Sequence, residues 1–369
     1  MNKNYCIYSV LVVCYLFLPL NGNSQDAKNS ISQAAEPVSQ EKGLFTTDDV
    51  LEIRLSGDIR ELLNDISDKP QLHHLRLSYR QKDSSVISIP VDAKTRGNFR
   101  RLSGNCYYPP ILLQFPKGND TNTSIFKGEN KLKLVMPCKG DQYIIYEWLV
   151  YRLYNVITPK SFRARLVRLK LENKNGKESS PFYGILLEEE KQMAQRNGAV
   201  SIKKVKLAPQ QTETESFLVM AMFEYLIGNT DWCVQYMQNI KLIAVDSTSV
   251  PTAVPYDFDM SGIVNSPYAK PAEELRLSSC RERRYRGYCI LDMQQFDKAI
   301  ELYNNRKEEI YSIYTKCTLL DAKYIKSTVK FLDEFYATIN NPKALEKAFG
   351  YPCDKSGTGN VLIKGLRED

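Results

Sequence analysis

The chain has 369 residues, of which 43% are hydrophobic and 25% are charged, a composition typical of globular proteins. Its formal net charge of +7 is modest and is spread over the chain, whereas nucleic-acid binding would require a clustered basic face, so we expect no nucleic-acid partner. The two histidines are the adjacent pair His73 and His74, which argues against a zinc site and against hydrolases that activate Ser or Cys through His.

The first 24 residues are typical of a secretory signal peptide. Lys3 precedes an apolar run from Tyr8 to Leu20, and small polar residues follow. The run is shorter than the roughly 18 residues that a membrane span requires, so we expect no stable span after cleavage. Residues 25–42 are polar and predict a disordered spacer. The chain is therefore expected to be secreted or to reside in the periplasm or cell envelope, with a lipoprotein anchored at Cys14 as the minor alternative.

Nine cysteines occur in the chain, and Cys6 and Cys14 fall within the predicted signal peptide, which leaves seven. An exported chain can oxidise pairs of cysteines, and an odd number leaves at least one thiol free or paired with another molecule. Cys280 and Cys289, which flank an arginine-rich loop, are the best candidates for a bridge. Scattered buried thiols are an equal alternative.

Residues 43–190 predict a strand-rich N-terminal lobe, because apolar and polar residues alternate along most of its segments. The expected strands are Val50–Leu55, Leu72–Tyr79, Val86–Val91, Pro109–Phe115, Lys131–Val135, Arg163–Leu171 and Phe182–Leu187, of which the last two form a hairpin. Helical spacing predicts helices at Asp58–Ile66 and Asp141–Val156, the second of which carries Glu147.

Two arginine-rich segments are candidates for contact with anions. In the turn Lys94–Arg101, Gly97 permits a left-handed backbone, and the loop either faces a phosphate or is a solvated hairpin tip. The run Arg281–Arg286 either receives an acidic or phosphorylated partner or forms a solvated turn. The residue types alone leave both questions open.

Residues 191–349 predict a mainly helical C-terminal lobe, and residues 350–369 a loosely ordered tail. Met193–Lys206 is expected to be a connector, and Glu213–Ile227 a helix with Thr212 or Thr214 as its cap and Gly228 at its end. Further along, the pattern predicts a strand at Ile240–Val245 and amphipathic helices at Phe296–Thr315 and Asp321–Ile339.

The segment from Asn229 to Gly262 concentrates acid and amide side chains. Asp231 and Asn239 lie eight positions apart, and an apolar strand then leads to Asp257 and Asp259. Kinases use this order, with an Asp that positions the nucleophile, an Asn that binds metal, and a later Asp that bridges metal and phosphates. Mg²⁺ prefers such oxygen ligands. The alternative is that these residues supply only turn and cap chemistry.

The order of these features resembles the CotH-like atypical protein kinases and the wider HipA-type branch, over roughly Val91 to Gly287. The segments that carry the resemblance are Lys94–Asn98, Lys131–Val135, the helix with Glu147, Tyr183–Glu190, Gly228–Asp231, Gln238–Ile243 and Pro255–Asp259. The resemblance implies an α+β protein with a two-lobed atypical protein-kinase-like fold, a strand-rich N-terminal lobe and a mainly helical C-terminal lobe.

The resemblance also implies a role for individual residues in the second half of the matching region. Asp231 would be the catalytic Asp that orients or deprotonates the acceptor hydroxyl. Asn239 and Asp257 would hold Mg²⁺ or Mn²⁺, and Asp259 would support the metal. Cys233 stands where many HipA-type sequences have a His, and the gap from Asp231 to Asn239 is longer than in ordinary protein kinases.

Phosphate and nucleotide contacts are implied for the first half. Lys133 matches the phosphate-binding strand lysine best, with Lys131 as the other candidate, and Glu147 would be its helix partner. Glu188 or Glu189 would lie beside the adenine and contribute mainly backbone groups. Because the chain has no Gly-x-Gly-x-x-Gly loop, the turn at Arg96 and Gly97 would have to cover the phosphates.

The resemblance therefore implies an exported kinase that transfers a phosphoryl group from ATP to a protein Ser, Thr or Tyr in a reaction that needs Mg²⁺ or Mn²⁺. Nucleotidyl transfer at the same site is a second enzymatic reading. A catalytically silent binding or surface protein is the rival from another class, since ATP is scarce outside the cytoplasm. The sequons at Asn119 and Asn122 would matter only in a glycosylating host.

Overall fold

The structure is a computed structural model that describes residues 43–354, apart from residues 82, 98, 103, 117–123 and 204–205. The expected signal peptide and spacer lie outside these residues. So do Asn98, both sequons and the part of the expected tail that follows residue 354.

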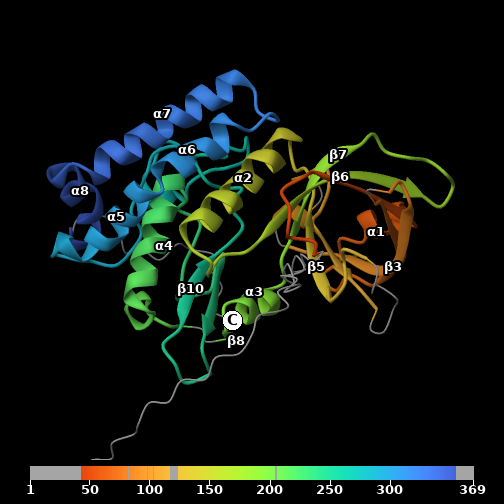
Figure 1. Ribbon diagram of the computed structural model, residues 1–369, viewed down its shortest axis with the longest axis horizontal. Coiled ribbons are helices and arrows are strands. Elements are labelled where there is room, and N and C mark those ends of the chain that lie inside the picture. Colours follow the sequence, from red (N-terminus) through yellow and green to blue (C-terminus); the bar gives the residue numbers. More distant parts are fainter. Residues whose placement is uncertain are drawn as a thin grey trace, which may run out of the picture. The chain divides into compact units, whose positions relative to one another are not determined.

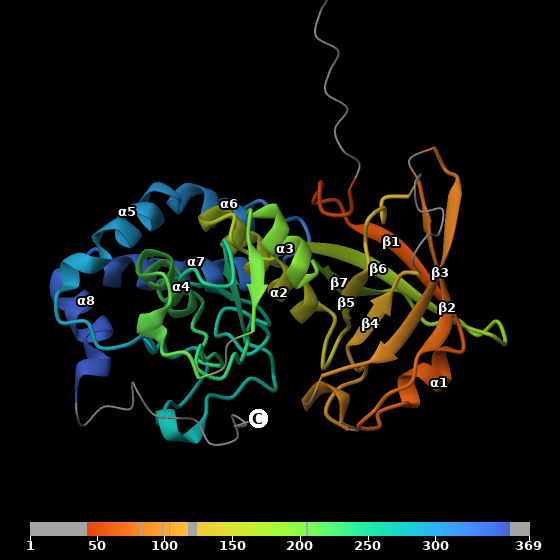
Figure 2. The ribbon, with the colours of Figure 1, turned by 90° about the horizontal axis from the view of Figure 1, so that it is seen from below.

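The first seven strands form a closed barrel in the order β1-β2-β3-β4-β5-β7-β6 (Figures 1 and 2). Neighbouring strands are antiparallel except β1 and β6, which pair in parallel and close the barrel, with Leu51 opposite Val167. The strands are β1 (Leu51–Gly57), β2 (His73–Arg80), β3 (Val86–Thr95), β4 (Ile111–Gln114), β5 (Lys131–Val135), β6 (Ala164–Asn173) and β7 (Phe182–Leu187).

Alternation along these strands sends every second side chain into the barrel. In β1, for example, Ile53 and Leu55 are buried while the residues between and beside them are more exposed. Aromatic side chains fill the interior together with the aliphatic ones, and the rings of Phe115 and Phe126 stack at 5.5 Å. The barrel therefore has a packed core of its own.

The expectation of a two-lobed kinase-like fold is wrong. Its strand-rich part should have been an open sheet, whereas the parallel pairing of β1 with β6 closes the sheet into a barrel. The broader α+β class is correct. Alternating residues predict strands equally well for open and closed sheets, and closure depends on a pairing between distant strands that alternation does not encode.

Apart from α1, whose Ile59 and Leu62 belong to the barrel core, the remaining elements contribute to a second hydrophobic core. Helix α2 (Gln142–Ile157) packs on the outside of β6 and β7 and also contacts α6, so it joins the barrel to the helical part (Figure 1). A small antiparallel sheet, β10-β9-β8, lies against α4. The other elements are α1 (Ile59–Asn64), α3 (Glu190–Arg196), β8 (Val200–Ile202), α4 (Thr214–Ile227), β9 (Ile240–Ala244), β10 (Thr252–Pro255), α5 (Asp297–Asn305), α6 (Lys307–Thr315), α7 (Ala322–Ile339) and α8 (Pro342–Phe349). Among the helices of residues 43–354, none has the length and apolar character needed to cross a bilayer.

Three local expectations differ from the structure. The connector expected at Met193–Lys206 instead contains the end of α3 and the strand β8. The helix expected at Phe296–Thr315 is divided into α5 and α6 at Arg306. Helix α4 is capped by Glu213 rather than by a threonine, because the Glu213 carboxylate accepts hydrogen bonds from the first free N–H groups of the helix.

The expected bridge between Cys280 and Cys289 is also wrong. Cys289 is bonded to Cys353, in the short turn that follows α8, and Cys280 is a free, buried thiol. A second disulfide joins Cys106 to Cys138. Spacing along the chain does not determine connectivity, because the fold decides which cysteines meet.

Candidate functional site

A partly buried ion pair joins the barrel to the loop that follows β10. Lys133 lies on β5, its side chain is only 11% exposed, and its Nζ lies 2.9 Å from Oδ1 of Asp257. Lys131, two residues earlier on the same strand, is exposed. Of the two candidate lysines, Lys133 is therefore the one that the structure brings to the acid cluster.

Asp257 is held in an unusual backbone conformation. Its φ is +68°, in the left-handed region that non-glycine residues seldom adopt, and its N–H donates to the Tyr151 hydroxyl at 2.9 Å. Burial would raise the pKa of this carboxyl, but Lys133, and then Arg100 and Arg96, hold the pKa below its usual value. Asp257 is therefore an ionised carboxylate in a fixed orientation.

Asp231 and Asn239 form the second pair. The Asn239 amide donates to the Asp231 main-chain oxygen at 2.7 Å and to its Oδ2 at 2.9 Å, while the Gln238 amide donates to Oδ1. The gap between the two residues, longer than in ordinary protein kinases, is taken up by a tight turn closed by a β-bridge between Cys233 and Gln238. The long gap therefore does not separate the two side chains.

The two pairs belong to one cluster. The Tyr256 N–H donates to the Asn239 carbonyl at 3.0 Å, which places the Asp257 loop directly beside the Asp231 turn. Burial raises the pKa of Asp231 to about 6, and the negative charges of Asp259 and Asp257 add to this rise. Residues from β5 and from the loops around β9 and β10 thus meet at one place.

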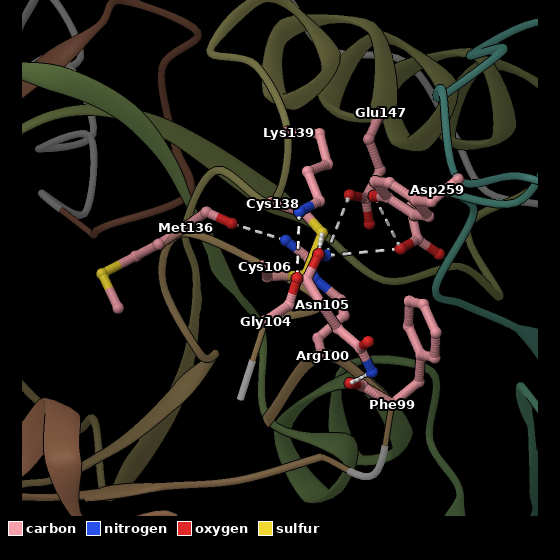
Figure 3. The surroundings of a disulfide bond; sticks show 11 residues. Phe99, Arg100, Gly104, Asn105, Cys106, Met136, Cys138, Lys139, Glu147 and Asp259 are labelled. Atoms are coloured by element: carbon pink, nitrogen blue, oxygen red, sulfur yellow. Dashed lines mark hydrogen bonds and ion pairs between the residues drawn. A yellow bond between two sulfur atoms is a disulfide. The ribbon is translucent and has the colours of Figure 1, made fainter. Parts of the chain in front are cut away.

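Arg100 is a member of the cluster that the sequence analysis missed. It follows β3, in the short helical turn η1 (Phe99–Arg101), and its side chain is 10% exposed. Its Nη1 lies 3.5 Å from Asp259 Oδ2 and 4.0 Å from Glu147 Oε2, and Nη2 donates to the Met136 carbonyl (Figure 3). The sequence did not single it out, because the basic turn contains several arginines and residue type alone does not distinguish them.

Glu147 was expected to pair with the strand lysine, but its ion pair in the structure is with Arg100. Burial raises the pKa of Glu147, and the negative charge of Asp259 raises it further, whereas Arg100 lowers it. Burial likewise raises the pKa of Asp259, as does Asp257, and Arg100 and the Tyr268 hydroxyl oppose this. Arg100 is thus the cation that balances two buried acids.

The residues expected beside the adenine lie apart from these contacts. The Glu188 carboxylate is buried and binds Arg196, at 2.9 Å from Nη2, and the N–H of Arg163. Glu189 forms the N-terminal boundary of α3, where its carbonyl accepts a hydrogen bond from the Met193 N–H. The Glu188 side chain therefore joins β6 to α3.

Arg96 and Gly97 of the basic turn make fewer contacts with the cluster than expected. Gly97 is exposed with φ +88°, and the Arg96 N–H donates to the Pro110 carbonyl at 2.9 Å. The positive charge of Arg96 lowers the pKa of Asp257, so its side chain lies within electrostatic reach of the cluster. Arg96 and the later residue Arg100 are therefore the residues through which this turn acts on the charges of the cluster.

Glu129, just before β5, offers a test of pH dependence outside the cluster. Burial raises its pKa from 4.5 to about 7, an effect that a hydrogen bond with Gln192 partly opposes. Its folded form therefore binds more protons than the unfolded chain, so stability is lost as pH rises from about 4.5 to about 7. Between pH 5 and pH 8 the free energy of unfolding should therefore fall by about 2 kcal/mol less in Glu129→Gln than in the wild type, as measured by urea unfolding. An equal loss in both proteins would contradict the prediction.

No family model matches the chain, and no curated protein matches it. The chemistry of the cluster bears on function more directly than the fold does, since one fold supports many activities.

The oxygen atoms of the cluster fit a hard divalent cation. Within the described residues, no hydrogen-bond donor meets Oδ1 of Asn239, Oδ2 of Asp257 or Oδ1 of Asp259. Mg²⁺ takes one or two carboxylates and completes its shell with water and substrate phosphates. Across the residues that the structure describes, no group of three or more His, Cys, Asp or Glu side chains could hold a metal alone. A metal held by these oxygens would therefore need further ligands, such as water or phosphate.

Proposed function

We propose that this chain transfers a phosphoryl group from ATP to a protein hydroxyl in a reaction that requires Mg²⁺ or Mn²⁺. The observation that carries the proposal is the meeting of Lys133 with Asp257 beside the Asp231–Asn239 pair. A strand lysine, two acids and an amide are the groups that phosphoryl transfer uses to bind phosphates and metal and to orient a hydroxyl. The proposal rests on this site chemistry and not on the fold.

Each residue has a distinct task in the proposed reaction. Asn239, Asp257 and Asp259 would hold the metal, which when bound neutralises charge on the phosphates. Lys133 would bind phosphate oxygens once its contact with Asp257 is shared with the metal. Asp231 would accept the hydroxyl proton, because both of its oxygens are held by amides and its pKa of about 6 leaves it ionised at neutral pH.

The same proposal includes a location outside the cytoplasm. Two disulfides occur within the described chain, and structural disulfides form and persist in oxidising compartments. They support the secreted, periplasmic or envelope location expected from the first 24 residues. The acceptor would be a protein with an accessible Ser, Thr or Tyr, and ATP would be the phosphoryl donor.

The test incubates the chain with ATP labelled at the γ or the α phosphate, Mg²⁺ or Mn²⁺, and dephosphorylated casein as a generic acceptor. Metal-dependent transfer of γ label to the acceptor or to the chain itself is the expected result. Transfer of α label would instead establish nucleotidyl transfer. Metal-dependent ATP binding without transfer would identify a binding protein, and absence of ATP binding would overturn the proposal.

A further inference from the structure

The Cys106–Cys138 disulfide lies beside the charged cluster (Figure 3). It ties the loop that begins with Arg100 to the segment between β5 and α2. Around it, the Tyr107 N–H donates to the Cys138 carbonyl at 2.9 Å, and Lys139 Nζ donates to the Gly104 carbonyl at 3.1 Å. The two segments are thus joined by one covalent bond and by hydrogen bonds on both sides of it.

The segment on the other side of the disulfide is short and connects two elements of the cluster. It leaves β5, which carries Lys133, and enters α2, which carries Glu147. Within it, the Met136 carbonyl accepts from Arg100. A single bond therefore ties the Arg100 loop to the junction between the strand lysine and the helix glutamate.

Arg100 needs such support, because its guanidinium is buried beside two buried acids. A buried charge is costly unless it is paired and hydrogen-bonded, and the Arg100 pairs are long, at 3.5 Å to Asp259 and 4.0 Å to Glu147. The Arg100 Nε and Glu147 Oε1 are also buried, and neither has a hydrogen-bond partner among the residues that the structure describes. Weak contacts of this kind depend on the surrounding chain to keep the groups in place.

We propose that Arg100 is a positioning residue of the site, held between Glu147 and Asp259 by the Cys106–Cys138 bond. Arg100 keeps the two acids together beside Asp257, and the bond keeps Arg100 there. Without the bond, the loop no longer fixes the position of the guanidinium, and the ion pair between Arg100 and Asp259 is lost. The part of this inference that concerns ATP rests on the proposed function, whereas the dependence of Arg100 on the disulfide does not.

A double-mutant cycle on unfolding tests this dependence without any ligand. The variants are Arg100→Gln, the pair Cys106→Ser with Cys138→Ser, and their combination. Each separate change should raise the equilibrium constant for unfolding. If the bond acts through Arg100, the two changes remove part of the same stabilisation, so the constant of the combined variant should be about tenfold lower than independent effects would give. Loss of the chain constraint itself contributes equally with and without Arg100, so it cancels in the cycle.

The other disulfide provides the matched control. Cys289→Ser with Cys353→Ser removes a bond that is not next to Arg100, so its effect should multiply with that of Arg100→Gln. Multiplicative effects for both disulfides would overturn the inference. Equal departures for both would overturn it too, because the coupling would then not be local.

Titration with Mn²⁺ and a non-hydrolysable ATP analogue tests the consequence for the site. Removing the Cys106–Cys138 bond should weaken analogue binding about tenfold, a loss of 1.4 kcal/mol. The control disulfide variant should bind as the wild type does, and Arg100→Lys should bind more tightly than Arg100→Gln because it keeps the positive charge. Unchanged binding without the Cys106–Cys138 bond would overturn the positioning role. A wild type that binds no analogue would count against the proposed function, while the unfolding cycle would still decide the link between Arg100 and the disulfide.

Discussion

Replacing Asp257 by asparagine is expected to lower metal-dependent transfer of the γ phosphate by about 10³-fold. Asn keeps the size of the side chain but removes the ionised oxygen that would bind the metal, and it leaves Lys133, now 2.9 Å from a carboxylate oxygen, beside a neutral amide. The rate of label transfer at saturating ATP and Mn²⁺ measures this effect. A fall in both metal affinity and rate is expected, because one carboxylate would hold the metal and orient the phosphates through it.

Asp246→Asn is the matched control for this variant. Asp246 lies in the loop between β9 and β10, where its carboxylate accepts hydrogen bonds from Thr248 and Ser249 on the surface. The same chemical change there should leave transfer within about twofold of the wild type, because surface changes away from a site have small effects. Unimpaired transfer in Asp257→Asn would remove Asp257 from the proposed mechanism.

Replacing Asp231 by alanine should separate chemistry from binding. Loss of a general base costs about 10²- to 10⁴-fold in rate, whereas the affinity for ATP should change by less than about threefold. The reason is that Asp231 is held by the amides of Gln238 and Asn239 and not by Lys133, so it would face the acceptor and not the phosphates. Single-turnover label transfer and a separate binding titration measure the two quantities.

Gln238→Ala provides a graded comparison for the Asp231 variant. It removes the amide that donates to Asp231 Oδ1 but leaves the carboxylate in place, so the rate should fall by only about tenfold. A large loss of ATP affinity in Asp231→Ala would contradict the proposed division of tasks. In that case Asp231 would belong to the nucleotide site.

Much of the candidate site could be predicted from the sequence, because several of its members lie in recognisable local patterns. Lys133 lies in an alternating strand, and Asp231 and Asp257 follow helix and strand ends where loops present polar groups. The order of such segments suggested that the side chains meet, and the structure brings them together. Local patterns were sufficient because each residue is oriented by its own short segment.

The remainder depended on contacts between distant segments. Arg100 could not be distinguished from Arg96 or Arg101 by residue type, since only the fold shows which arginine reaches Glu147. The partner of Cys289 and the closure of the barrel were missed for the same reason. Pairings of this kind are decided by the assembled core, which no single window of sequence contains.

The parallel pairing of β1 with β6 bears on how the chain is made. Strand β1 leaves the ribosome first, but the strand that closes the barrel with it emerges only after β5 and α2 have been synthesised. Until then β1 has an unpaired edge, and the first strands cannot complete a core. Because β7 lies between β5 and β6, the barrel that carries Lys133 cannot close until both β6 and β7 have been synthesised. A chain that stalls before then would be exposed to aggregation and to proteases.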